Sequence, residues 1–374
     1  MIIDGSKGGG QVLRTALAMS LLTNMPFKIK DIRINRPNPG LKQQHFTALN
    51  LIQEIYDVNL SKYEIGTKEL TFIPKNTRLK TKRIKCDIQT AGSITLLLQS
   101  ILPALMFADA KLIVIDIKGG TDVAFSMPFD FLKYVFLPQI NYLTKDMKLK
   151  LIKRGFYPKG SGEINLRIKP DHINNHDDFN DFHKEMLEKE LEFNYVEQGK
   201  IQNITGISLA TLDLQKREVA ERQARSARLL LKNHARANIR IEYCDSLSTG
   251  SSVVLFAKYS TGNFVDISKK HPIILGADAL GKQKVSAEEV GKSAANDMIK
   301  LIKSEAVVDE YSADNIIPFL VIVGGKIKTN KITDHIVANV YVVNEFLKAL
   351  KSEYFINIDS IHNTISLEKK KNEK

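Results

Sequence analysis

The sequence predicts an α/β (α+β) protein in which three repeated βαβαββ units form a large domain and a smaller α/β domain is inserted before the third unit. Three observations lead to this prediction. The order of strands and helices returns after about 80 residues, Gly-rich breaks stand at similar places in each copy, and the chain becomes strongly polar after residue 170. An offset of this size exceeds the roughly 20 to 50 residues of solenoid repeats, which favours duplicated folding units.

The first unit opens with a glycine run, Gly8-Gly9-Gly10, directly before an amphipathic segment. Periodicity and turn residues give its elements. They are a helix over 11–23, a strand over 27–34, a helix over 41–56, and two short β segments over 61–65 and 69–73.

The second unit repeats this order, with Ala91-Gly92-Ser93 in place of the glycine run and Gly119-Gly120 after a β-branched strand. Its predicted elements are a helix to residue 107, a strand over 111–117, a helix over 128–142, and strands over 148–153 and 163–168.

The third unit is expected near the C-terminus, and a polar Asn/Asp/His-rich linker over 171–179 precedes the inserted domain. The third unit has helices over 286–303 and 335–350, an apolar run of undetermined type over 316–323, and a hairpin over 354–358 and 364–367. The insert has strands over 206–210, 236–243 and 252–259 and a helix over 218–232. We therefore predict a large domain over 1–179 and 276–374 and an inserted domain over 180–275.

The composition excludes several classes of protein. With 43% hydrophobic and 26% charged residues in 374, the chain is not broadly disordered. Because no apolar stretch approaches ~18 residues and the start lacks a basic and apolar leader, we expect a cytoplasmic protein with no membrane association. Cys86 and Cys244 are too few for a disulfide framework or a cysteine zinc site.

The charge balance suits a polyanionic partner. There are 54 Lys and Arg against 42 Asp and Glu, a net charge of +12, and such a field attracts phosphates. Lys-rich surfaces also serve solubility alone, so the positions of the 13 arginines are more informative.

Three of these arginines, Arg14, Arg33 and Arg36, lie around the first two Gly/Pro-rich turns. Backbone N–H groups at a glycine-rich helix start and guanidinium groups both bind phosphate, so we interpret this cluster as a phosphate site, with surface ion pairs as the alternative. The pair Gln44-His45 on the following helix is either part of the same site or a solvent-facing or core pair.

Two further segments carry candidate residues. The segment from Asp309 to Asn315 holds two aspartates five residues apart, Asp309 and Asp314. His335 follows a capping Thr333 or Asp334, where a helix N-terminus favours the neutral imidazole needed for a nucleophile or base. A surface or core histidine is the alternative. Pro128 and Phe131 follow Gly119-Gly120-Thr121-Asp122, and they form either an apolar floor for a base or core packing.

Several stretches in fixed order resemble one family. They are Ile3-Asp4-Gly5, Gly8-Gly9-Gly10-Gln11-Val12-Leu13-Arg14-Thr15-Ala16-Leu17, Ile32-Arg33 with Arg36 and Pro39-Gly40-Leu41, Gln44-His45, Ala91-Gly92-Ser93 with Leu98-Gln99, Gly119-Gly120-Thr121-Asp122, Gly155-Phe156-Tyr157-Pro158-Lys159-Gly160-Ser161-Gly162, Lys284-Val285-Ser286-Ala287-Glu288, Asp309-Glu310-Tyr311-Ser312-Ala313-Asp314, and His335 with Asn339. Together they resemble the RNA 3′-terminal phosphate cyclases over nearly the whole chain outside the linker and insert.

The resemblance implies an ATP-dependent enzyme that closes an RNA 3′-terminal phosphate into a 2′,3′-cyclic phosphate through a covalent histidine–AMP. It implies His335 as the nucleophile, and RNA, ATP and a divalent metal, Mg or Mn, as the species bound. The implied ATP contacts are Gln99, Tyr311, Ser312, Ala313, Asp314 and Asn315, with Pro128 and Phe131 at adenine. The implied phosphate contacts are Arg14, Arg33, Arg36 and Gln44.

The chain departs from the family pattern at Lys7, where a glutamate associated with the metal–ATP site is usual, at Asn315 in place of Gln, and at Ala338 in place of Thr. Lys7 favours the alternative of a cyclase-like RNA-binding or ribosome-assembly factor without adenylation, whereas His335 favours the enzyme. An enolpyruvyl transferase, built from similar repeats, has no need of this histidine.

Overall fold

The computed structural model describes residues 1–176, 178–260, 268 and 270–371. The first repeat folds into a four-stranded sheet of order β1-β2-β4-β3, in which β1 and β2 are parallel and the other pairs antiparallel. Its elements are β1 (Ile2–Asp4), α1 (Gly10–Thr23), β2 (Phe27–Lys30), α2 (Gln43–Ile55), β3 (Tyr56–Leu60) and β4 (Leu70–Leu79).

The second repeat has the same strand order, β5-β6-β8-β7, with β5 and β6 parallel. Its elements are β5 (Arg83–Asp87), α3 (Ile94–Met106), β6 (Ile113–Gly119), α4 (Phe129–Phe131), a π-helical stretch (Leu132–Phe136), α5 (Leu137–Ile140), β7 (Thr144–Lys153) and β8 (Gly162–Pro170). Short 3₁₀ turns occur at Gly5–Lys7, Asn141–Leu143 and Leu212–Arg217.

The third repeat again gives the order β9-β14-β16-β15, with β9 and β14 parallel. Its elements are β9 (Phe193–Tyr195), α9 (Glu310–Val323), β14 (Gly325–Lys328), α10 (Asp334–Ala349), β15 (Tyr354–Asp359) and β16 (Thr364–Lys369), with α6 (Phe179–Glu188) before β9. The predicted fold class is therefore confirmed: βαβαββ occurs three times with one topology.

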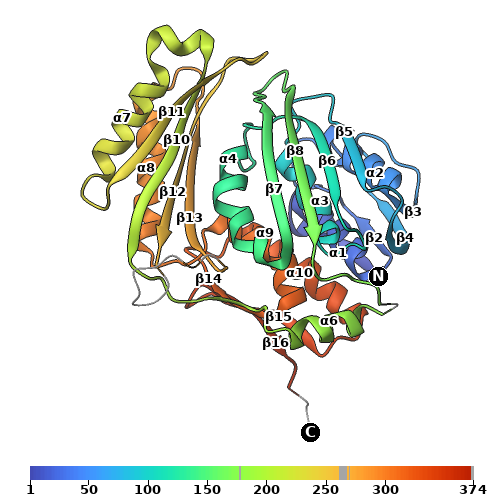
Figure 1. The fold of residues 1–374 in the computed structure, drawn as a ribbon. Helices are drawn as coiled ribbons and strands as arrows, with labels where there is room; N and C mark the ends of the chain where they lie inside the picture. Colours follow the sequence, from blue (N-terminus) through green and yellow to red (C-terminus); the bar gives the residue numbers. More distant parts are fainter. Residues whose placement is uncertain (177, 261–267, 269, 372–374) are drawn as a thin grey trace.

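The inserted module lies between β9 and α9 and forms a sheet of order β11-β10-β12-β13 (Figure 1). Its elements are β10 (Ile201–Thr211), α7 (Val219–Leu231), β11 (Ala237–Cys244), β12 (Ser251–Tyr259), β13 (Ile273–Leu280) and α8 (Ala287–Lys303). Helices α7 and α8 pack on each other and on this sheet.

The limits at 180 and 275 stay a prediction, but strand pairing favours other ones. The strand β9 pairs with β14 of the third repeat, whereas β13 pairs with β12 of the insert. Because α8 also packs on α7, we propose that the insert runs from Ile201 to Lys303 and interrupts the third repeat after its first strand.

Several predicted elements differ from the structure. The apolar run at 316–323 is the second half of α9, and the segment 61–65 is a loop because strand β3 begins directly after α2. Strands β1, β5, β9, β13 and β14 were not predicted either. Of these, β1, β9 and β14 have only three or four residues, and β5 is polar in part.

The first helices of the three repeats, α1, α3 and α9, pack on one another together with α10 in the middle of the large domain (Figure 1). All residues of α1 from Gln11 to Thr23 are buried, which explains its lack of a clear polar face. Each repeat therefore brings the start of one helix to a common centre.

Candidate active site

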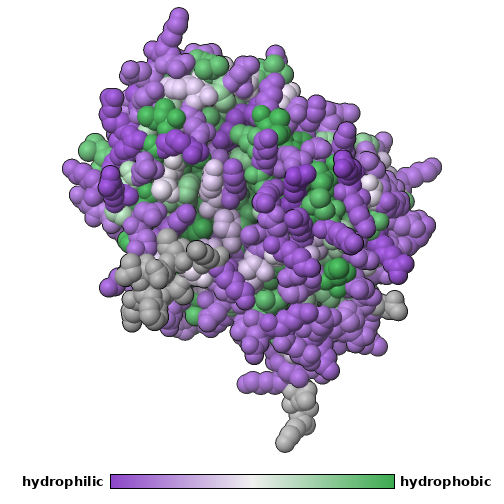
Figure 2. All heavy atoms as spheres, in the orientation of Figure 1, coloured by the Kyte–Doolittle hydropathy of each residue, from purple (hydrophilic) through white to green (hydrophobic). Residues whose placement is uncertain are grey.

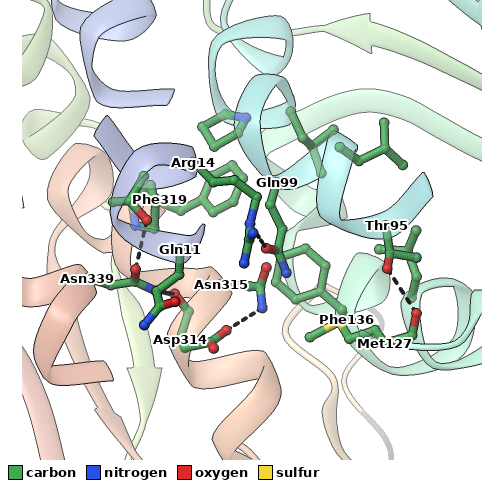
Figure 3. Close-up of a pocket in the computed structure, with 16 residues that line it drawn as sticks. Gln11, Arg14, Thr95, Gln99, Met127, Phe136, Asp314, Asn315, Phe319 and Asn339 are labelled. Carbon is green, nitrogen blue, oxygen red and sulfur yellow. Dashed lines mark hydrogen bonds between the residues drawn. The ribbon is translucent and has the colours of Figure 1, made fainter. Parts of the chain in front are cut away.

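A pocket with about 550 Å³ of open space lies where these helices meet (Figure 3). Its polar lining comes from all three repeats: Gln11, Arg14 and Thr15 from α1, Thr95 and Gln99 from α3, Asp314 and Asn315 from α9, and Asn339 from α10. Met127, Phe136 and Phe319 are among the apolar residues of its wall. The structure thus brings together four predicted site residues that lie far apart in the sequence.

Arg14 occupies the second turn of α1 and is only 9% exposed. Its Nε–H donates to Oε1 of Gln99 at 2.9 Å, which joins the first two repeats (Figure 3). Burial lowers the pKa of Arg14 to about 10, although the charge of Asp314 opposes this shift. Among the described residues, Nη1 and Nη2 have no hydrogen-bond partner, so they are free to meet an anion.

Asp314 accepts hydrogen bonds from two asparagine side chains. Asn315 donates its Nδ2–H to Oδ1, and Asn339 donates to the Asp314 carbonyl at 2.9 Å. Thr15 in turn donates to Oδ1 of Asn339 at 2.8 Å, so α1, α9 and α10 are tied together. Burial raises the pKa of Asp314, and the neighbouring His335 and Arg14 oppose that rise.

His335 lies in the first turn of α10, as predicted, and the side chain of Thr333 caps this helix by accepting the Ile336 N–H at 3.3 Å. The His335 Nδ1 is 3.5 Å from Oδ2 of Asp314, and 51% of its side chain is exposed. A hydrogen on Nδ1 facing the carboxylate would leave the lone pair on Nε2, the form that a nucleophilic histidine needs.

The glycine run lets side chains approach the start of α1 closely. A Cβ on Gly10 would lie 2.6 Å from Nε2 of His45 and 2.9 Å from Nη1 of Arg14, and a Cβ on Gly9 would lie 3.1 Å from Nη2 of Arg36. Three nitrogen groups therefore surround a helix start that has no side-chain cap. Such a cradle fits the oxygens of a phosphate.

His45 is buried against Gly10, so it is not solvent-facing, and its role in a site stays a prediction. It is 2% exposed, and its Nδ1 accepts the Lys42 N–H at 3.0 Å, which leaves the hydrogen on Nε2. Burial, followed by the charges of Arg14, Arg33 and Lys42, lowers its pKa to about 3. Gln44 lies beside it and lines a smaller cavity of about 240 Å³ together with Arg14.

The Arg33 side chain binds backbone carbonyls of its own loop. It has a left-handed backbone (φ 54°), and its Nη1 donates to the carbonyls of Asn38 at 2.9 Å and Gly40 at 3.0 Å. Burial, assisted by the charge of Arg36, lowers its pKa. Arg36 is exposed and reaches Gly9. Their predicted phosphate contacts stay predictions.

Of the residues predicted to contact adenine and ATP, some are exposed and others are buried. Tyr311 is 51% exposed and contacts the Phe131 ring edge-on, with centroids 6.1 Å apart. Pro128, Phe131, Ser312 and Ala313 are buried. Ser312 donates its backbone N–H and its hydroxyl to Asp309, at 2.8 and 3.0 Å, so it stabilises the start of α9.

Sequence reasoning missed Thr95, which lines the pocket and donates to the Met127 carbonyl at 2.9 Å. A signal was present, because Thr95 precedes Gln99 by one helical turn and therefore shares its face. Gln11 and Asn339 also line the pocket, and both stand in the quoted motifs without an assigned role.

The described residues contain no group of three or more His, Cys, Asp or Glu side chains that could hold a metal ion. The protein side chains alone therefore do not fit a metal cage, and we derive no step through a metal. The nitrogen groups of the cradle, in contrast, fit a phosphate group. None of the described helices is long and apolar enough to cross a bilayer.

An α/β fold with guanidinium groups around a helix start and a histidine–carboxylate pair defines an enzyme that handles phosphate groups. Comparison with known proteins agrees. The family model of RNA 3′-terminal phosphate cyclase matches residues 6–351. The chain belongs to this family.

Similar proteins named RNA 3′-terminal phosphate cyclase occur in several archaea. The chain is 42% identical over 349 residues to that of Pyrococcus furiosus, covering 92% of this chain and 93% of the relative. It is 37% identical to that of Thermococcus kodakarensis, covering 92% of each. It is 36% identical to that of Archaeoglobus fulgidus, covering 94% of this chain and 97% of the relative. The predicted family is confirmed.

Proposed function

We propose that this enzyme uses ATP to convert an RNA 3′-terminal phosphate into a 2′,3′-cyclic phosphodiester. The observation that carries the proposal is the His335–Asp314 pair, 3.5 Å apart, on the same helix cluster as the guanidinium of Arg14. A cytoplasmic location stays a prediction from the sequence.

The first step is nucleotidyl transfer to the enzyme. The Nε2 lone pair of His335 attacks the α-phosphorus of ATP, the bond to the bridging oxygen breaks, and pyrophosphate leaves. Asp314 stabilises the positive charge that the imidazole gains, and Arg14 and Arg36 stabilise the negative charge on the phosphate oxygens. Tyr311 offers an exposed ring on which adenine can stack.

The second and third steps use the RNA. An oxygen of the RNA 3′-phosphate attacks the adenylyl phosphorus, the N–P bond breaks, and His335 is restored. The 2′-hydroxyl of the same nucleotide then attacks the 3′-phosphorus, loses its proton and displaces AMP. The cradle at Gly9 and Gly10 would hold the RNA phosphate, with Arg14, Arg36 and His45 as its donors.

A divalent cation, Mg²⁺ or Mn²⁺, would enter with the ATP phosphates and neutralise part of their charge. Lys7, which is exposed and stands where related enzymes have a glutamate, favours the second candidate function, RNA binding without adenylation. The two candidates differ in whether a covalent AMP forms.

The deciding experiment incubates the protein with α-labelled ATP and Mg²⁺, Mn²⁺ or Co²⁺ and measures covalent label. We expect an acid-labile, alkali-stable label that is lost in His335→Ala. His362→Ala is a matched control, because His362 is also exposed and pairs with a carboxylate, its Nδ1 2.6 Å from Asp359. A folded wild-type protein that takes no label with any of the three metals would leave the RNA-binding alternative.

A further inference from the structure

Three large apolar side chains stand exposed on neighbouring loops beside the pocket. Phe125 is 100% exposed, Tyr157 75% and Leu247 54%. They belong to the connections β6–α4, β7–β8 and β11–β12, so both the second repeat and the inserted module contribute. On the face drawn in Figure 2, apolar side chains appear among hydrophilic ones at the upper end, where these two parts of the chain approach each other in Figure 1.

The loops are held against one another. The Thr121 N–H donates to the Gly155 carbonyl at 2.9 Å, and Asp122 forms a β-bridge with Phe156. On the other side, the Lys159 N–H donates to Oγ of Ser248 at 3.0 Å. The three exposed side chains therefore sit on one connected rim rather than on separate mobile loops.

Phe125 is presented by a closed loop. The loop is fixed at its base, where the Phe129 N–H donates to the Thr121 carbonyl at 2.9 Å. Phe125 itself has φ 64°, a left-handed conformation that is unfavourable for a bulky side chain. A strained and fully exposed aromatic ring points to a binding role, because neither packing nor backbone preference accounts for it.

The rim leads into the pocket. Met127, two residues after Phe125, is part of the pocket wall, and its carbonyl accepts the Thr95 hydroxyl. On the opposite side, Gly160 approaches the backbone of Thr90 and Ala91, and Gly92 approaches the Gln44 side chain, which lies beside the phosphate cradle. A chain whose 3′ end is bound in the cradle would thus cross the rim.

Lysines accompany the apolar side chains. Lys159, Lys282 and Lys284 are exposed, and none has an ion-pair partner within the described part of the chain. The loop that carries Lys282 and Lys284 joins the rim, since the Gly281 N–H donates to the Ser251 carbonyl at 2.8 Å. Exposed aromatic rings interleaved with unpaired cations are what single-stranded nucleic acid requires, rings for the bases and cations for the phosphates.

We propose that Phe125, Tyr157, Leu247, Lys159, Lys282 and Lys284, here called the rim patch, bind the single-stranded 3′ end of the RNA substrate, with bases stacked on Phe125 and Tyr157. The proposal rests on the proposed function for the identity of the substrate. It assigns RNA binding to a surface separate from His335, so the two can be tested independently.

The test measures the affinity of a fluorescently labelled oligoribonucleotide of about ten nucleotides with a 3′-phosphate, alongside RNA-free labelling by ATP. We expect Phe125→Ala and Tyr157→Ala each to weaken RNA binding and raise the KM for RNA about tenfold, with the AMP label formed at the wild-type rate. Lys282→Ala should lower the slope of log Kd against log salt by about 0.7. Ile361→Ala, an 87% exposed apolar residue on the β15–β16 turn, should change nothing.

Two results would overturn the proposal: RNA affinity within twofold of wild type in the double variant Phe125→Ala/Tyr157→Ala, or a raised KM for ATP in RNA-free labelling, which would place the rings at the nucleotide instead. Failure of the proposed function is a separate result, namely absence of label in the wild-type protein. The RNA affinities would still decide the role of the rim patch.

Discussion

The Nδ1 of His335 lies 3.5 Å from Oδ2 of Asp314, and the two residues come from different helices, α10 and α9. The carboxylate is 13% exposed and the imidazole 51%, so a largely buried acid stands beside an exposed histidine. Because Asp314 is fixed by Asn315 and, through its carbonyl, by Asn339, its position depends on the packing of three helices.

We predict that Asp314→Asn lowers the rate of AMP labelling about 100-fold, because the amide keeps the shape but neither fixes the tautomer nor stabilises the imidazolium. The rate of label formation at saturating ATP measures this. Asp359→Asn, which alters the exposed His362 pair, should label as wild type. Wild-type labelling by Asp314→Asn in folded protein would exclude the orienting role.

Gly10→Ala should lower activity strongly while changing the free energy of unfolding little. A methyl group there would meet Nε2 of His45 at 2.6 Å and Nη1 of Arg14 at 2.9 Å, so the donors must move apart. Alanine is otherwise the better residue at a helix start, so we expect a change of less than about 1 kcal/mol in the free energy of unfolding.

Cyclisation by Gly10→Ala should fall at least about tenfold, since a displacement of ~1 Å in a binding group has large effects. Denaturant unfolding and kcat/KM for RNA give the two quantities. A fall in kcat/KM that is accompanied by a comparable loss in the free energy of unfolding would indicate a general packing defect. It would contradict the phosphate-binding role of the cradle.

A third prediction concerns the contact between the second repeat and the insert. Arg154, 4% exposed, bonds Asp130 at 2.6 Å and Asp122 at 3.2 Å, while Ser252 of β12 donates to Asp122 at 3.2 Å. Burial raises the pKa of Asp130 to about 6 despite Arg154. Arg154→Met leaves two buried carboxyls without their cation and should lower the free energy of unfolding by about 3–5 kcal/mol.

The measurement is denaturant unfolding at pH 7, with Arg167→Met on the exposed face of β8 as the control, for which we expect a change within about 0.5 kcal/mol. A loss below about 1 kcal/mol for Arg154→Met would show that the buried ion pairs contribute little to the free energy of unfolding.

The repeat architecture was predictable because glycine breaks and apolar periodicity mark each unit locally. The strand pairing around the insert was not. Strand β9 has three residues and pairs with β14, where Phe193 is the partner of Gly325, 132 residues later, and nothing in the local pattern of β9 specifies that partner. Likewise α8 reads as an ordinary amphipathic helix, and only packing shows that its apolar face lies on α7.

The candidate site, too, could be predicted from the sequence only in part. His335, Asp314 and Arg14 were proposed from motifs and rare residue types, and the structure places Arg14 and Asp314 in one pocket and His335 beside Asp314. Ser312 and Ala313 carry the same motif, yet in the structure they are core residues at the start of α9, because a motif does not show which side of a helix is buried. The convergence of α1, α3 and α9, which brings Arg14 to Gln99, is a tertiary property with no local signal.

The last prediction follows from His45, whose pKa of about 3 lies below the ~6.5 of an unfolded chain. Between these values the unfolded state binds a proton that the folded state does not, so stability falls as the pH falls below about 6.5. The loss is about 1.4 kcal/mol per pH unit for one group, or roughly 2–3 kcal/mol at pH 4.5.

His45→Gln removes this titration. Thermal or denaturant unfolding at pH 7 and pH 4.5 measures the effect. From pH 7 to pH 4.5, the free energy of unfolding of the variant should rise relative to that of the wild type by roughly 2–3 kcal/mol. His183, buried with a pKa of about 4, should give an effect of nearly the same size and direction at pH 4.5 when changed to Gln. If the free energies of unfolding of wild type and His45→Gln differ by the same amount at both pH values, His45 has the same pKa in the folded and unfolded states. That result would contradict a neutral His45 beside Gly10.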